Sequence, residues 1–75
     1  MKITGTVEWV EMGSGTWGLQ GEDGQTYELY GSKAEDSASD LEGKKVIATG
    51  NIRDDVMTMA MIGPVLEVES FEVVD

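Results

Sequence analysis

The sequence predicts an all-β fold, a small five-stranded barrel with one short helix between its third and fourth strands. Three observations lead to this prediction. Apolar and polar residues alternate with a period of two along most of the 75 residues, as they do in half-buried strands. Glycine-rich turns separate the alternating segments. Between residues 32 and 41 the apolar spacing changes to that of a helix.

The first three strands are predicted over residues 2–11, 16–20 and 25–30. Their apolar, inward faces consist of Ile3, Val7 and Trp9, then Trp17 and Leu19, then Tyr27 and Leu29. Gly5 shares the parity of the first set, where a strand glycine marks a sharp bend or a close backbone approach. Asp23–Gly24 predicts a tight hairpin, because both residues adopt positive φ at low cost. The three strands should therefore form an antiparallel meander.

The helix is predicted over residues 32–41. One thin apolar stripe, at helical spacing, consists of Ala34, Ala38 and Leu41. Ser32 precedes Glu35 by three residues, which is the spacing of a capping box. Gly43 is a suitable stop. We expect about two turns of helix, placed so that the stripe closes one end of the barrel.

The remaining strands are predicted over residues 44–52 and 56–62, and a return strand over residues 65–74 continues or extends the fifth back along the first. Gly63–Pro64 separates the last two segments. The parity of the return strand changes between Val68 and Phe71, so we expect a bulge near Glu69–Ser70.

This order of strands, with a bent first strand and one helix, is that of the Greek-key barrel called the OB-fold. The residues also resemble a family, small prokaryotic OB-type domains of unknown function. The resemblance rests on Gly5-x-Val7-Glu8, Gly15-x-Trp17-x-Leu19, Asp23-Gly24 with Tyr27-Glu28-Leu29, and Gly43-Lys44-x-Val46 with Gly50. The resemblance covers most of the chain and supplies no active site to transfer. A chain of 75 residues is long enough for one compact core only, so we expect a single OB-type barrel domain over residues 1–75.

Composition excludes several classes of function. Fifteen acidic residues against five basic ones give a net charge of -10, which argues against binding to phosphate backbones. The chain has no histidine or cysteine, so we expect no catalytic residues, no metal site and no cofactor. The acidic clusters lack the spacing of a calcium loop. There is no apolar run of membrane-spanning length and no signal segment, so we expect no membrane association and a cytoplasmic location.

The usual ligand face of an OB-fold is the outward side of strands two and three. Here that side consists of Thr16, Gly18, Gln20, Thr26, Glu28 and Tyr30. Only Tyr30 among them can stack on a base, and none is basic, which disfavours an oligonucleotide. Trp9 and Trp17 have inward parity, so we expect them to fill the core rather than to form a ligand platform.

Met57, Met59 and Met61 share one face of the predicted fifth strand. A methionine stripe of this kind fills a core, forms a partner or dimer surface, or binds a soft metal ion. Together with Tyr30 these methionines are the candidate partner surface of a noncatalytic binding module, and the favoured partner is another protein. We expect a monomer or a weak homodimer.

The alternative hypothesis is a divergent OB-fold protein that binds single-stranded nucleic acid. A groove that joins Tyr30 to Lys33, Lys44 and Lys45 would favour this alternative.

Overall fold

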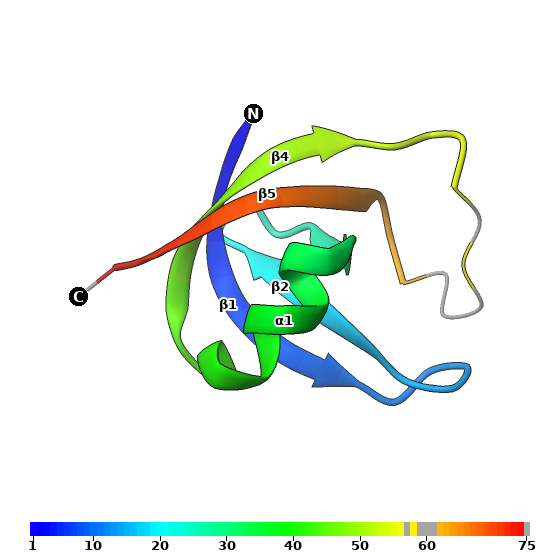
Figure 1. The fold of residues 1–75 in the computed structure, drawn as a ribbon, viewed down its shortest axis with the longest axis horizontal. Coiled ribbons are helices and arrows are strands. Elements are labelled where there is room, and N and C mark those ends of the chain that lie inside the picture. Colours follow the sequence, from blue (N-terminus) through cyan, green and yellow to red (C-terminus); the bar gives the residue numbers. More distant parts are fainter. Residues whose placement is uncertain (57, 59–61, 75) are drawn as a thin grey trace.

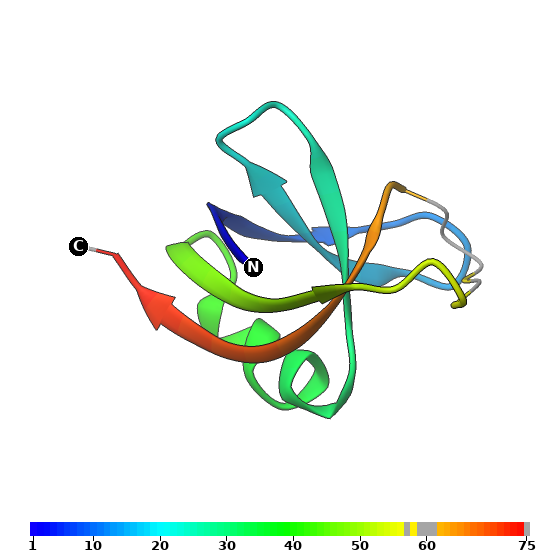
Figure 2. The same cartoon turned by 90° about the horizontal axis from the view of Figure 1, so that it is seen from above.

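Five strands close into a barrel in the order β1-β2-β3-β5-β4 (Figures 1 and 2). The computed structural model describes residues 1–56, 58 and 62–74. Within this part of the chain the elements are β1 (Lys2–Val10), β2 (Thr16–Gly21), β3 (Thr26–Tyr30), α1 (Ser32–Leu41), β4 (Lys45–Ile52) and β5 (Val65–Val73). The predicted fold class, a small OB-type barrel with one short helix between strands three and four, is confirmed.

Antiparallel pairing joins β1 to β2, β1 to β4, β2 to β3 and β4 to β5. A short parallel ladder between β3 and β5 closes the barrel, with Glu28 opposite Val65 and Tyr30 opposite Glu67. Its start is fixed by the backbone, because the N–H of Glu28 donates to the carbonyl of Pro64 at 2.8 Å. Each described strand thus pairs with two others, although β3 and β5 pair over three residues only.

Gly5 lies where β1 changes from one neighbour to the other, opposite Gly21 of β2 and Val46 of β4. A Cβ atom at Gly5 would collide with the backbone carbonyl of Gln20. The close backbone approach that the sequence predicts is therefore confirmed, and it lets one long strand belong to two sides of the barrel.

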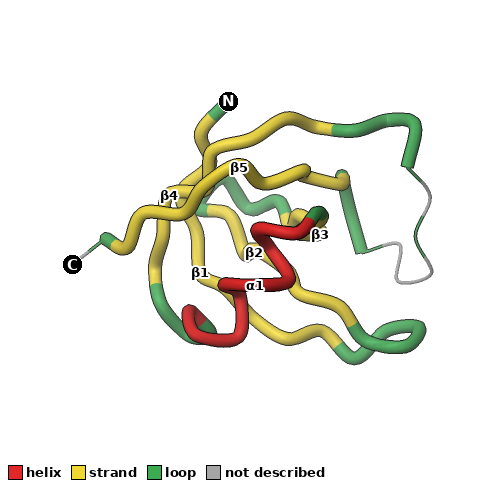
Figure 3. Tube along the Cα trace, viewed as in Figure 1, coloured by secondary structure: helices red, strands yellow, loops and turns green. Residues whose placement is uncertain are grey.

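The core consists of inward-facing strand residues and the buried stripe of the helix, and its buried members are Ile3, Val7, Leu19, Tyr27, Leu29, Ala34, Ala38, Val46, Ala48, Leu66 and Val68. The helix packs on the side of the barrel formed by β3 and β5 (Figure 3). Leu41 lies partly buried at the edge of this core. The predicted apolar stripe of the helix thus contacts the barrel interior, as expected.

The helix begins differently from the prediction. Gly31, with φ of 103°, occupies the position before the first turn, and no side chain caps the helix. Ser32 is already inside the first turn, so the predicted capping box with Glu35 is wrong. The N–H of Glu35 instead donates to the carbonyl of Gly31 at 3.1 Å. The glycine takes this place because the chain must turn sharply between β3 and α1, through a conformation that L side chains rarely adopt.

The fifth strand of the barrel is the predicted return strand. Val56, Thr58 and Ile62 belong to no strand, and the other four residues of the predicted fifth strand lie outside the described residues. Strand β5 pairs with β4 and β3 rather than with β1. The expected bulge is confirmed, since Thr49 pairs with Ser70 and Gly50 with Val68, which leaves Glu69 between them without a partner residue.

Candidate binding site

The outward face of β2 and β3 is partly covered by Thr58 and Ile62, which lie between β4 and β5 in the sequence. A Cβ atom at Gly18 would lie 3.2 Å from Cδ1 of Ile62, and Gly18 is buried. Thr58 donates from its hydroxyl to Oε1 of Glu28 at 2.5 Å. Glu28 is only 4% exposed. The expectation that Gly18 and Glu28 stand on an open ligand face is therefore wrong, because a connection distant in sequence folds over them.

Tyr30, the candidate surface residue of the third strand, is 37% exposed at the end of β3. Met57, Met59 and Met61, its predicted companions, lie outside the described residues. The basic groove that would favour nucleic acid gains no support from the described side chains. Lys33 lines a different cavity from Tyr30. Lys45 forms an ion pair with Glu22 at 2.6 Å.

The two tryptophans face each other across β1 and β2. Their ring centroids are 4.9 Å apart and the ring planes meet at 69°, the edge-to-face arrangement that aromatic pairs prefer. Trp17 is partly buried against the core, whereas Trp9 is 43% exposed. The prediction that Trp9 fills the core is thus wrong. Its parity is inward, but it lies one register step beyond Val7, the last fully buried residue of β1.

The turn between β1 and β2 holds the indole of Trp9 in place. The N–H of Gly15 donates to the carbonyl of Met12 at 3.0 Å and closes this turn. Gly15 has φ of 91°, and a Cβ atom there would collide with the indole ring, at 3.0 Å from Cη2. The ring of Trp9 therefore contacts both the backbone of Gly15 and the ring of Trp17.

A cavity of about 260 Å³ opens beside this pair, at the start of α1. Its aromatic lining consists of Trp9, Trp17 and Tyr30. Leu29 and Ala34, both members of the core, also line it and supply an apolar base. The sequence pattern did not identify this site, because two of its three aromatic residues have the parity of the core.

The cavity exists because β2 and β3 separate there. Their ladder covers three residue pairs and ends with Gly18 opposite Glu28. Beyond that pair β3 continues along β5 on its other edge, so that Tyr30 lies opposite Glu67. Thr16 and Trp17 continue along β1. The cavity lies between these two diverging segments.

The charges around this cavity are negative. Glu28 and Glu35 line it, and none of the described residues in its lining is basic. Glu11 and Trp9 line a shallower neighbouring hollow. The start of α1 adds a partial positive charge, but Glu35 lies in the first turn of this helix and offsets it. The site therefore combines exposed aromatic faces with a negative potential.

Two other polar clusters stabilise turns. The hydroxyl of Tyr27 donates to Asp23 at 2.7 Å, and this hydrogen bond raises the pKa of Tyr27 and lowers that of Asp23. Arg53 donates to both carboxylate oxygens of Asp55 and to Glu67 at 2.8 Å. These hydrogen bonds raise the pKa of Arg53. The hydrogen bonds from Arg53 also lower the pKa of Asp55 to about 2. Arg53 thereby ties the start of the β4–β5 connection to β5.

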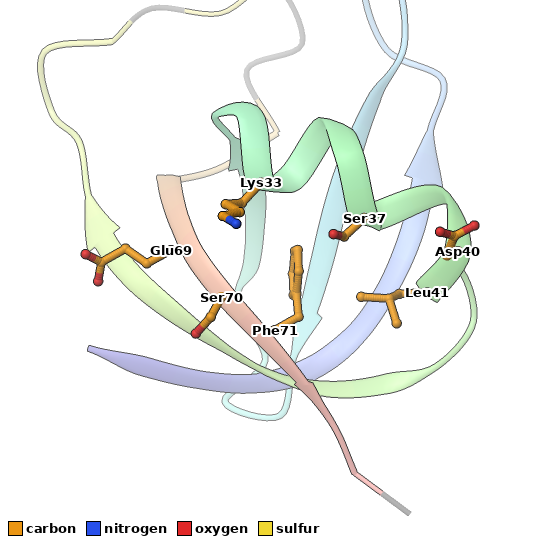
Figure 4. Close-up of a pocket in the computed structure, with 7 residues that line it drawn as sticks. All are labelled: Lys33, Ser37, Asp40, Leu41, Glu69, Ser70 and Phe71. Atoms are coloured by element: carbon orange, nitrogen blue, oxygen red, sulfur yellow. The ribbon is translucent and has the colours of Figure 1, made fainter.

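A second cavity, of about 410 Å³, lies between α1 and β5 (Figure 4). The ring of Phe71 rises from β5 toward the helix beside Lys33 (Figure 4). The carboxylates of Asp40 and Glu69 lie at opposite ends of the view and do not point toward one another (Figure 4). Because its charged groups are of both signs and do not converge, this cavity has no evident ligand preference.

Among residues 1–56, 58 and 62–74 no group of three acidic side chains is placed to hold a metal ion. The helix described in this chain is too short and too polar to cross a bilayer. Comparison with protein-family models, with curated proteins and with solved structures found no match for this chain.

Proposed function

We propose that the protein is a noncatalytic protein-binding module, and that its partner presents a basic surface. The observation that carries this proposal is the exposed ring of Trp9, which packs on the partly buried Trp17 within an acidic surface. Tryptophan and tyrosine are enriched at the centres of protein interfaces, where they supply large contact areas from few rotatable bonds.

The surface charge supports a basic partner. The acidic residues that lie exposed are Glu11, Glu22, Asp23, Glu35, Asp36, Asp40, Glu42, Asp54, Asp55, Glu69 and Glu72. Two of the five basic residues, Lys45 and Arg53, are engaged in ion pairs with neighbouring carboxylates. A field of one sign speeds encounter with an oppositely charged partner and opposes encounter with one of the same sign.

The same observations disfavour single-stranded nucleic acid. Barrels of this kind bind oligonucleotides on the outward face of their second and third strands. In this chain Ile62 and Thr58 lie over that face, and the central side chain of β3 on it is the carboxyl group of Glu28. A polyphosphate would meet negative charge where it needs positive charge.

The experiment is an amide chemical-shift titration of the whole chain against a basic protein, an acidic protein, single-stranded DNA and single-stranded RNA. We expect saturable shifts with the basic protein alone, weakened by added salt. Saturable shifts with an oligonucleotide, lost in a Lys44→Glu/Lys45→Glu variant, would instead establish the nucleic-acid hypothesis. If none of the four ligands causes saturable shifts, the proposal is refuted for these partners.

A further inference from the structure

We propose that the cavity bounded by Trp9, Trp17 and Tyr30 is an anchor site for an arginine side chain of a partner protein. We call it the aromatic cavity. This inference rests on the proposed function and names the group that the surface would recognise. Four features of the site support it, and each is independent of the net charge of the chain.

The first feature is the exposed aromatic faces. A guanidinium group is attracted to the negative face of an aromatic ring, and tryptophan gives the strongest such contact. Trp9 remains 43% exposed and Tyr30 37% exposed, although burial of these rings would remove apolar area from water. The edge contact with Trp17 leaves part of the Trp9 ring available to a ligand.

The second feature is that the site is formed in advance. The indole of Trp9 packs against Gly15 and against the ring of Trp17, and Trp17 itself packs against the core. A ligand that enters therefore does not have to order these rings, which lowers the entropic cost of binding.

The third feature is charge. Glu28 and Glu35 both belong to the lining, but the carboxyl group of Glu28 is buried and accepts a hydrogen bond from Thr58, so the exposed carboxylate is that of Glu35. The basic residue of the neighbouring turn, Lys33, lines the other cavity. One full negative charge outweighs the partial charge of about half a unit at the start of a helix. An anion would be repelled by Glu35, and an uncharged apolar group would form no ion pair with it.

The fourth feature is size. At about 260 Å³ the cavity is smaller than the pockets of about 300–1,000 Å³ that enclose small-molecule ligands. It suits one long side chain whose apolar stem contacts Leu29 and Ala34 while its charged head lies between the rings and the carboxylate of Glu35. Arginine fits better than lysine, because its planar group stacks on aromatic rings and pairs with carboxylates through two hydrogen bonds.

The test uses the full chain and three capped peptides, Gly-Ser-X-Ser-Gly, in which X is arginine, lysine or citrulline. Citrulline keeps the length and planarity of arginine and lacks its charge. The readout is the shift of the indole N–H signals of Trp9 and Trp17 in nitrogen-15 NMR. We expect the arginine peptide to bind most tightly, the lysine peptide less tightly and the citrulline peptide least. Citrulline binding as tightly as arginine would overturn the proposal, and tighter binding of lysine would overturn the preference for arginine.

Matched variants separate the aromatic and the electrostatic contributions. Trp9→Leu keeps an apolar side chain and removes the ring, and we expect it to weaken the arginine peptide about two- to fivefold, whereas Trp9→Phe weakens it less. Glu35→Gln and Asp36→Asn each remove one exposed carboxylate from the same helix turn, but only Glu35 lines the cavity. We expect the first to weaken binding and the second to leave it nearly unchanged.

The outcomes distinguish the two proposals. If the basic protein binds but neither Trp9→Leu nor Glu35→Gln alters its affinity, the module function stands and the aromatic cavity is not its anchor. If Glu35→Gln and Asp36→Asn weaken the arginine peptide equally, only the general negative potential attracts it, and the anchor site is refuted. If no basic protein binds, the proposed function fails, and the peptide series alone decides whether the cavity recognises arginine.

Discussion

Replacement of the two tryptophans by alanine, singly and together, measures whether the aromatic cavity is formed in the free protein. Truncation of a fully buried tryptophan costs about 3–5 kcal/mol of folding free energy. Trp17 is partly buried against the core, so we assign about half of that to its packing, and the edge-to-face contact with Trp9 adds about 0.5–1.5 kcal/mol. Trp17→Ala should therefore destabilise the chain by about 2–4 kcal/mol.

Trp9→Ala loses the same ring contact but less buried area, because Trp9 is 43% exposed. We expect a cost of about 1–2 kcal/mol. A domain of this length has a total stability of only about 4–11 kcal/mol. At about 4–8 °C for each kcal/mol, Trp17→Ala should lower the melting temperature by about 8–32 °C and Trp9→Ala by about 4–16 °C.

The assay is urea unfolding followed by circular dichroism for the wild type, both single variants and the double variant. The coupling free energy from this cycle should be about 0.5–1.5 kcal/mol, the value of the ring contact alone. A coupling indistinguishable from zero would mean that the rings do not touch in solution and that the cavity lacks its wall. A larger loss for Trp9→Ala than for Trp17→Ala would contradict the order of burial.

Three further predictions concern the backbone, the hairpin and the cover of the outward face. Gly5→Ala should strongly lower the melting temperature, because it places a Cβ atom against backbone. The control is the exposed Gly24→Ala, where a Cβ atom meets nothing and only the positive φ of 87° should reduce stability. Tyr27→Phe should return the lowered pKa of Asp23 toward its ordinary value of 3.8, measured by carbon-13 titration of the carboxyl group. Because that pKa is lowered in the folded state, the stabilising contribution is present above about pH 4 and is lost as the pH falls through the folded pKa; a pH dependence of stability unchanged by Tyr27→Phe would contradict this. Thr58→Val removes the hydrogen bond to a carboxyl group that is only 4% exposed, so we expect a loss of about 1–3 kcal/mol in urea unfolding, against no measurable loss if the cover contributes nothing.

Local pattern was sufficient for most of the fold. The alternation of apolar residues gave the correct inward faces for Val7, Leu19 and Leu29, and the change of spacing located the helix over Ser32–Leu41. Gly5 and the parity change near Glu69 predicted the bend and the bulge. These features are decided by the chain within a few residues, because side-chain direction follows backbone periodicity and glycine permits a close approach.

The features that tertiary structure decided involve segments distant in sequence. Parity shows which way the Trp9 side chain points, but not that the fully buried core ends at Val7, since that depends on where the rest of the barrel lies. Likewise nothing local to β3 indicates that Thr58, thirty residues away, covers Glu28. The sequence also offered two segments, residues 56–62 and 65–74, as the strand that closes the barrel. The parallel ladder to β3 shows that this strand is Val65–Val73. The aromatic cavity lies where the ladder between β2 and β3 has ended and β3 continues along β5, an arrangement of three strands that no single segment specifies.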